Sequence, residues 1–275
     1  MGKKAYGVLC ICIAALLATG CFAGKDKGKK EDTSASTPTQ SGALGVYDEI
    51  EERIISGSLI FAIDGEEASV TGYCEEDVEE IDIPDTLVYE NKSYKVTSIA
   101  AEALSYQLSI KSVTIPETIT SIGKEAFCGC ELLESIDIPD SVTSLGNGAF
   151  YDCVVLKSCT LGKGITSLPN EIFTNCYELK DFTVSDTIVA IGAEAFWGCE
   201  SIKKLDVPES VVSIGDRAFY GSGIRQLTIA SKSISMADDM LEGMNDLKKL
   251  YVDKQFVRDM KENLNEDVKV QGIKE

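Results

Sequence analysis

The sequence predicts an α/β repeat solenoid, a fold in which copies of one short unit stack along a single axis. Two observations with the same period of 23 residues predict it. A phenylalanine recurs at this interval with a cysteine three positions after it, and short apolar runs such as Val113–Pro116 and Ile136–Pro139 recur in step. A unit this short cannot bury its apolar face alone, so neighbouring copies must cover it.

The composition narrows the class of protein. The chain has 275 residues, is 44% hydrophobic and has a formal net charge of -19. This size allows a large core, and the negative charge repels nucleic acid, so we expect no nucleic-acid partner. The chain contains ten cysteines and no histidine, and it therefore lacks the commonest general base of enzymes.

The N-terminus is typical of an exported protein. Two lysines precede an apolar run over residues 5–18, which is too short to span a membrane but suits a signal peptide. The run ends in Leu-Ala-Thr-Gly-Cys, which resembles the lipobox of bacterial lipoproteins, whose cysteine carries a diacylglycerol. We expect residues 1–20 to be a lipoprotein signal peptide and Cys21 to be the lipid anchor that holds the protein on the cell surface. Ordinary cleavage after Ala23 is the alternative.

Residues 21–42 are expected to form a flexible tether. They are rich in Lys, Ser, Thr and Gly and contain few apolar side chains. Such a segment cannot offset the entropy lost on folding.

Residues 43–102 are expected to form an N-terminal cap that begins with a helix. Val46, Ile50 and Ile54 recur every four residues, and Ser56-Gly57 follows as a stop. This spacing predicts a short helix.

A β-hairpin is expected next in the cap. Leu59, Phe61 and Ile63 stand at every second position before Asp64-Gly65, and Ala68, Val70 and Gly72 do so after it. This pattern predicts two strands joined by a tight turn. Such a hairpin covers the first edge of the stack, where an end repeat otherwise exposes apolar surface and unpaired backbone.

The cap region is strongly acidic. Residues 43–102 contain sixteen acidic and three basic side chains. Clustered carboxylates bind calcium in some proteins, but the spacing of an EF-hand loop is missing here. We therefore predict a solvated acidic surface and no metal.

Each repeat is expected to contain two short strands. In the first, Cys159 and Leu161 point inward while Ser158 and Thr160 point outward, as the two-residue period of a strand requires. The second strand follows a turn and is closed by glycine, as in Val142–Gly146.

The full repeat resembles a known family. A strand ending in Ile-Pro, then Val-Thr-Ser-Ile-Gly, then Ala-Phe-x-Gly-Cys is similar to the BspA-like leucine-rich repeats of bacterial surface proteins, over residues 58 to about 260. The resemblance implies a right-handed coil with a parallel β-sheet on the concave face, and surface binding or adhesion as the role. We assign residues 103–252 to the repeats. Leu104 replaces the phenylalanine of the first copy, and the sixth copy is one residue shorter, since Leu241 follows Phe219 by 22 positions.

Residues 253–275 are expected to form a C-terminal helical cap. Phe256, Val257, Met260 and Leu264 lie on one face of a helix, and Asp253 is placed to cap its N-terminus.

The repeated aromatic and thiol positions predict a buried structural ladder. Its members are Phe127, Cys130, Phe150, Cys153, Phe173, Cys176, Phe196, Cys199 and Phe219. Zinc sites bring C-x₂-C pairs into a tetrahedron, whereas these cysteines lie in a line at about 4.8 Å per coil. We therefore predict buried free thiols with no metal and no cofactor, and we expect Cys74 and Cys128 to be the surface thiols.

The sequence argues against an enzyme. It lacks a G-x-S-x-G element, a glycine-rich phosphate loop and a nucleophile with a histidine base. The carboxylates of Asp137 and Asp206 stand three coils apart, at about 14 Å, too far for glycoside cleavage. A hydrolase is the remote alternative.

The outward side chains of the first strands predict the binding face. We expect an extracellular protein ligand to contact this face, and we expect a monomer. The predicted ligand-binding residues are Ser135, Asp137, Ser158, Thr160, Asp181, Thr183, Lys204, Asp206, Gln226 and Thr228.

Glycan binding is the alternative to a protein ligand. Tyr151, Trp197 and Tyr220 follow the repeat phenylalanine in three copies, and exposed aromatics of this kind bind sugars. Aromatics at this position also simply cover the edge of a coil, and both interpretations stay open.

Overall fold

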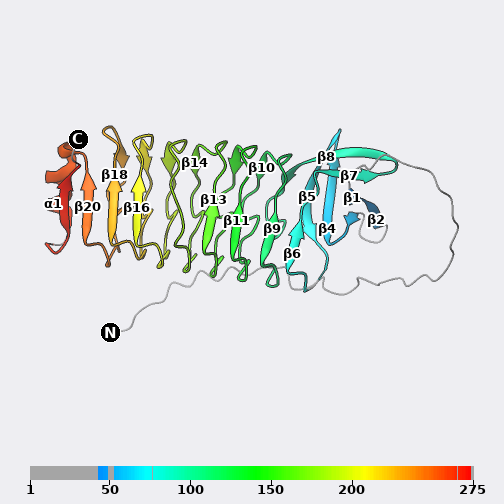
Figure 1. The fold of residues 1–275 in the computed structure, drawn as a ribbon, viewed down its shortest axis with the longest axis horizontal. Helices are drawn as coiled ribbons and strands as arrows, with labels where there is room; N and C mark the ends of the chain where they lie inside the picture. Colours follow the sequence, from blue (N-terminus) through cyan, green and yellow to red (C-terminus); the bar gives the residue numbers. More distant parts are fainter. Residues whose placement is uncertain (1–42, 49–52, 76, 265, 274–275) are drawn as a thin grey trace. The chain divides into compact units, whose positions relative to one another are not determined.

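The computed structural model describes residues 43–48, 53–75, 77–264 and 266–273. The predicted signal peptide, the tether and Cys21 lie outside these residues. Within the described part, coils stack in parallel register and contribute short strands to two rows (Figure 1), which we call the first and second strand columns.

The first strand column holds the longer strands of the coils. Its members are β6 (Glu80–Asp82), β9 (Ser112–Thr114), β11 (Ser135–Asp137), β13 (Ser158–Thr160), β16 (Lys204–Val207), β18 (Gln226–Ile229), β20 (Lys249–Val252) and β21 (Lys269–Gly272). Neighbours pair in parallel, for example Ser135 with Ser158 and Thr228 with Tyr251. Burial alternates along each strand, so outward polar residues flank inward apolar ones.

The second strand column holds two-residue strands that begin from a longer one, β8 (Lys92–Ile99). They are β10 (Ser121–Ile122), β12 (Ser144–Leu145), β14 (Ser167–Leu168), β15 (Ala190–Ile191), β17 (Ser213–Ile214) and β19 (Ser235–Met236). A glycine directly follows most of these strands, because the preceding coil leaves no room for a side chain there. A Cβ on Gly146 would lie 2.2 Å from the nitrogen of Lys124 on the preceding coil.

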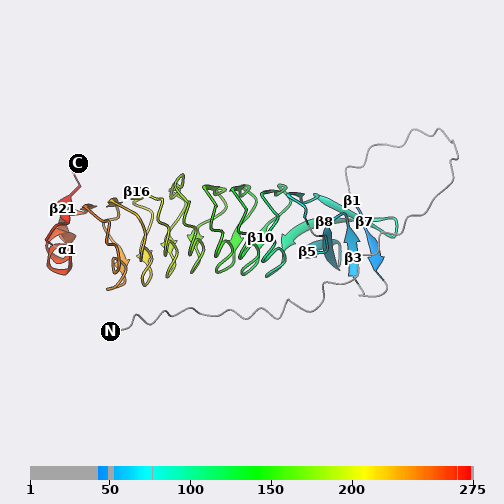
Figure 2. The ribbon, with the colours of Figure 1, turned by 90° about the horizontal axis from the view of Figure 1, so that it is seen from below.

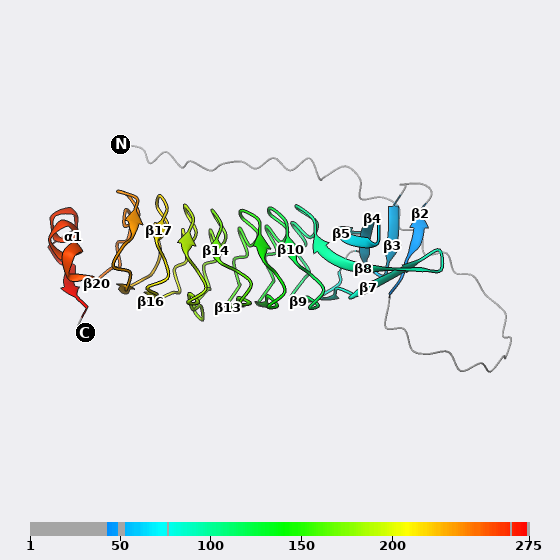
Figure 3. The same ribbon diagram turned by 90° about the horizontal axis from the view of Figure 1, so that it is seen from above.

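The N-terminal cap is a sheet that continues the second strand column. It contains β1 (Ala43–Leu44), β2 (Val46–Asp48), β3 (Arg53–Ser56), β4 (Leu59–Asp64), β5 (Glu67–Tyr73) and β7 (Thr86–Tyr89). The hairpin β4–β5 turns at Gly65, whose φ is +61°. Because β5 pairs with β8 and β8 pairs with β10, this hairpin lies beyond the first coil, at the end of the stack opposite to α1 (Figures 2 and 3).

The helix expected from Val46, Ile50 and Ile54 is wrong. The described residues on either side, Val46–Asp48 and Arg53–Ser56, are antiparallel strands, and Val46 pairs with Ile55. β-branched side chains lose freedom in a helix and fit a pleated sheet. The helical spacing rested on three residues only, and the pairing of β3 with β4 favours the strand instead.

The C-terminal cap contains the predicted helix and, in addition, one strand that the sequence did not predict. Asp253 accepts a hydrogen bond from the nitrogen of Gln255 and caps a 3-10 turn, η1 (Lys254–Phe256), which leads into α1 (Val257–Asn263). The chain then returns as β21, which pairs with β20.

A stack of phenylalanines runs through the core. Phe127, Phe150, Phe173, Phe196 and Phe219 have no exposed surface, and neighbouring rings stack with centroids 5.5–5.9 Å apart. Each buried ring contributes about 1.5–3 kcal/mol. An aromatic pair adds about 0.5–1.5 kcal/mol.

The first strand column is interrupted at the coil that carries Phe182. Here only an isolated bridge joins Ser158 to Asp181. The Phe182 ring lies edge-on between Phe173 and Phe196, at 5.0 and 5.3 Å, where other coils place Val, Ile, Leu or Cys. The larger side chain fills the core beside small Cys159 and coincides with the loss of the ladder.

Candidate functional site

The ten residues predicted to bind a ligand all lie on the outer side of the first strand column. We call them the candidate ligand face. Ser158, Gln226 and Thr228 are half-buried, and the other seven side chains are exposed. Parallel pairing places Ser135 beside Ser158 and Asp206 beside Thr228, so small polar side chains line up from coil to coil. Asp181 and Thr183 belong to the coil that lacks a strand.

The charged residues of the candidate ligand face partly neutralise one another. The Lys204 ammonium forms an ion pair with the Asp206 carboxylate. Partial burial alone would raise the pKa of Asp206, but hydrogen bonds from Lys204 and Thr228 and the Lys204 charge lower this pKa below its usual value. This end of the face therefore offers a fixed pair of opposite charges, while Asp181 stays exposed.

The structure separates the carboxylates that a glycosidase would need. Asp137 lies on β11 and Asp206 on β16, which belong to different sheets. Across the described ranges, no three His, Cys, Asp or Glu side chains come together in a way that could hold a metal ion.

The three aromatic residues at the coil edge include one stacked pair. Trp197 and Tyr220 stack on each other with ring centroids 4.2 Å apart. Thr174 lies between Tyr151 and Trp197 in the repeat order, is buried, and donates a hydrogen bond to the main-chain oxygen of Glu194 at 2.8 Å. All three aromatics are half-buried, and one face of Trp197 is covered by Tyr220.

The thiols of the ladder are shielded from solvent. Cys130, Cys153, Cys176 and Cys199 are fully buried. Burial raises the pKa of Cys130 to about 12 and also raises the pKa values of the other three. The neutral thiol is therefore the favoured form at these four positions.

The prediction that Cys128 is a surface thiol is wrong. Its side chain is 3% exposed, and its Sγ lies 3.6 Å from the hydroxyl of Tyr106 on the preceding coil. This contact comes from a residue 22 positions earlier in the sequence, so the local sequence could not reveal it. Cys74 is partly exposed, with its Sγ 3.6 Å from the main-chain oxygen of Ser58.

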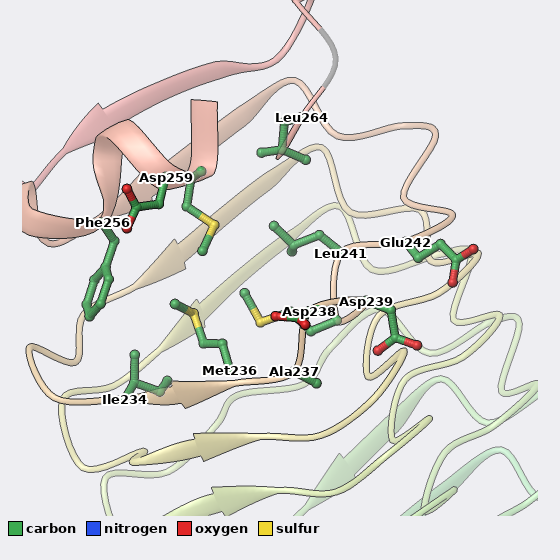
Figure 4. Close-up of a pocket in the computed structure, with 12 residues that line it drawn as sticks. Ile234, Met236, Ala237, Asp238, Asp239, Leu241, Glu242, Phe256, Asp259 and Leu264 are labelled. Atoms are coloured by element: carbon green, nitrogen blue, oxygen red, sulfur yellow. The ribbon is translucent and has the colours of Figure 1, made fainter. Parts of the chain in front are cut away.

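A groove that the sequence did not predict lies between the last coil and α1 (Figure 4). Its volume is about 980 Å³. Side chains of the coil and of the helix segment point into the gap, and all the charged residues that line it are acidic. Its apolar lining includes Ile234, Met236, Leu241, Phe256, Met260 and Leu264, and its acids are Asp238, Asp239, Glu242 and Asp259.

This groove occupies the place where another coil would extend the second strand column. The main-chain oxygens of Val189 and Val212 each accept a hydrogen bond of 2.8 Å from the next coil. The corresponding oxygen of Ile234 meets no donor among the described residues, because β21 extends only the first strand column. The helical spacing of Phe256 and Met260 predicted that this face of the helix packs against the last coil. The sequence did not predict the groove, because its depth depends on how α1 packs against that coil.

The fold defines a class of protein, a solenoid of stacked repeats with parallel strands in register. The chain belongs to the family described as the BspA type leucine rich repeat region, which matches in six copies over residues 97–196 and 166–273. The match confirms the resemblance and the leucine-rich-repeat fold expected from the sequence. Membership is consistent with a non-catalytic binding scaffold.

Two solved structures are similar to the chain. A leucine rich cell surface protein from Faecalibacterium prausnitzii has a TM-score of 0.64 and 26% identity, and the match covers 73% of this chain and 54% of that chain. This chain thus spans about half the length of that protein. The T. pallidum leucine rich repeat protein has a TM-score of 0.65 and 20% identity over 77% of this chain and 97% of that one, which supports the fold alone.

One further comparison and one property of the helices complete the description. No curated protein sequence matches the chain at a significant level. In the part of the chain that the structure describes, none of the helices has the length and apolar character needed to cross a membrane.

Proposed function

We propose that this protein is an exported surface lipoprotein that binds an extracellular protein ligand, without catalysis, through the candidate ligand face. One observation carries the proposal: outward polar side chains line up in register over successive parallel strands. Small side chains such as Ser135 and Thr160 let a partner's backbone approach closely. The Lys204–Asp206 pair and exposed Asp181 orient it by charge.

The affinity of a single copy is expected to be modest. The candidate ligand face has no large aromatic side chain at its centre, and buried aromatic anchors carry most of the binding energy in tight interfaces. Display of many copies on one cell surface raises the overall affinity without new contacts.

The lipid anchor at Cys21 is part of this proposal. The apolar run at 5–18 and the cysteine that follows it support it. Metabolic labelling with a fatty acid is expected to mark the protein, and unchanged labelling of Cys21→Ser would contradict the anchor.

Glycan binding at the aromatic edge is the second candidate function. The stacked pair of Trp197 and Tyr220 favours it. We rank it below protein binding because the two rings cover each other. Binding of the purified protein to a glycan array that is lost in Trp197→Ala would reverse this order.

The decisive experiment is a pull-down from extracellular proteins with residues 43–275 as bait. Asp181→Lys with Asp206→Lys changes the candidate ligand face, and Glu75→Lys with Glu79→Lys makes the same change of charge on the cap. We expect the first variant to lose the captured partner and the second to keep it. The reverse result would place the site on the acidic cap.

A hydrolase assay tests the absence of catalysis. We expect no turnover by the purified domain. Turnover that disappears on changing a single carboxylate, such as Asp137→Asn, would contradict the proposal.

A further inference from the structure

One position of the repeat carries a cation on five successive coils, although the net charge of the protein is -19. This position immediately precedes the first strand of its coil, or, at Lys180, the isolated bridge at Asp181. Lys157 is half-buried, and the other four side chains are exposed. We call this set the basic column; its members are Lys157, Lys180, Lys203, Arg225 and Lys248.

Main-chain hydrogen bonds join the members of the basic column at three of its four steps. The nitrogen of Lys180 donates to the oxygen of Lys157 at 3.1 Å, that of Arg225 to Lys203 at 2.9 Å, and that of Lys248 to Arg225 at 2.9 Å. Neighbouring members therefore start about 4.8 Å apart. β13, β16, β18 and β20 run in the same direction (Figure 1), so the residues before them lie along one edge of the stack.

The basic column differs from the same position in earlier coils. There the position holds Glu79, Lys111 and Glu134 in turn. Glu79 pairs with Lys111 at 2.7 Å, and Glu134 pairs with Lys157, the first member of the column, at 2.8 Å. From Lys180 onward the members form no ion pair with any described residue. The Lys203 ammonium donates only to the main-chain oxygen of Glu200. Like charges on neighbouring strands destabilise a sheet, so folding alone does not account for this arrangement.

We propose that the basic column binds a linear acidic polysaccharide that carries about one carboxylate or sulfate per sugar. An extended sugar chain is narrow, and each sugar advances by a length similar to one coil step, so successive anionic groups meet successive cations. Several weak contacts in series then give useful binding. This site adjoins the candidate ligand face but does not depend on the proposed protein ligand.

The surroundings of the basic column select against other polyanions. Glu178, Glu200 and Asp246 lie on the turns just before it and are exposed. These acids repel a broad anionic surface such as a membrane or a nucleic-acid duplex, whereas a single thin chain avoids them.

The test measures binding of the full chain to polygalacturonate by fluorescence anisotropy at low and high salt. Lys180→Gln, Lys203→Gln, Arg225→Gln and Lys248→Gln are changed together. The control changes Lys124, Lys163, Lys232 and Lys261 to Gln, which lowers the net charge equally at exposed positions elsewhere. We expect the column variant to lose about tenfold or more in affinity and the control less than about twofold.

Fragment length and competing polymers complete the test. Binding is expected to strengthen with fragment length until the chain spans the column, and neutral dextran is expected not to bind. The column variant is expected to fold at least as stably as the unchanged protein, since it removes like-charge neighbours; if it unfolds instead, the like-charge argument fails. Equal loss in both variants, no binding of polygalacturonate, or tighter binding of anionic vesicles or an oligonucleotide would overturn the proposal.

Discussion

The Sγ of Cys153 donates a hydrogen bond to the main-chain oxygen of Phe127 on the preceding coil, at 3.2 Å. The same oxygen accepts the nitrogen of Cys130 from its own coil, also at 3.2 Å. The contact recurs from Cys176 to Phe150 and from Cys199 to Phe173. A cysteine at this position therefore fills the core and also joins one coil to the next.

Ser222→Cys is expected to stabilise the protein. Ser222 occupies the cysteine position of the sixth coil, and its buried hydroxyl has no hydrogen-bond partner among the described residues. A thiol reaches further and can donate to the oxygen of Phe196, as in the other coils, so the free energy of unfolding should rise by about 1 kcal/mol. Urea denaturation measures the change. A lower stability for Ser222→Cys than for Ser222→Ala would show that the thiol contact contributes nothing.

Among the cysteines of the described part, alkylation of the folded protein is expected to be confined to Cys74. The other six cysteines of the described part are buried, so the reagent does not reach them. The thiols of the ladder also have raised pKa values, which disfavours the reactive thiolate. Iodoacetamide at about pH 8 should label Cys74 first and the remainder only after unfolding. Mass spectrometry of the unfolded, alkylated protein also reports pairing, and a disulfide between any two of Cys130, Cys153, Cys176 and Cys199 would contradict the prediction of free thiols.

Alkaline pH is expected to destabilise the fold through the buried thiols. Burial raises the pKa of Cys130 to about 12 and also raises the pKa values of Cys153, Cys159, Cys176 and Cys199. An unfolded thiol has a pKa of about 8.5, so stability is full below that pH and falls above it, where only the unfolded state loses protons. Each thiol contributes a slope of about 1.4 kcal/mol per pH unit.

The slope of unfolding free energy against pH checks this prediction. Denaturation of the unchanged protein and of Cys176→Ala is compared between about pH 9 and pH 10.5. The free energy of unfolding of Cys176→Ala should fall less steeply with pH than that of the unchanged protein, by the contribution of one thiol. Equal slopes would mean that Cys176 also ionises in the folded protein.

Phe173→Ala is expected to be among the most damaging single changes. The ring of Phe173 stacks on Phe150 and Phe196 and meets the edge of Phe182. Removing it leaves a cavity with rigid walls and should lower the free energy of unfolding by about 3–5 kcal/mol. Leu44→Ala, at a side chain that is 69% exposed, is the matched control and should change stability by less than about 0.5 kcal/mol. Similar losses in the two variants would argue against the stack as the main source of stability.

The sequence predicted the repeat because the same side chains are buried on every coil. The sequence-based predictions were wrong where the local structure depends on contacts between coils or with another strand. Cys128 is covered by Tyr106, which a reader of the local sequence cannot place. The strands around residues 46–56 form because β4 is available as a partner. For the candidate ligand face, alternation within a strand predicted which side chains point outward. The missing strand at Asp181 coincides with the Phe182 ring lying between Phe173 and Phe196, an arrangement that involves three coils.

The two strand columns are interrupted at different levels. The first loses its ladder on both sides of the coil that carries Asp181, where β14, β15 and β17 of the second column remain paired. The second has no pairing between β12 and β14, and β11 with β13 spans that step. No junction between these coils thus lacks a hydrogen-bonded ladder. A stack with such overlapping joints has no preferred plane of separation, so its two halves should melt together as one cooperative unit.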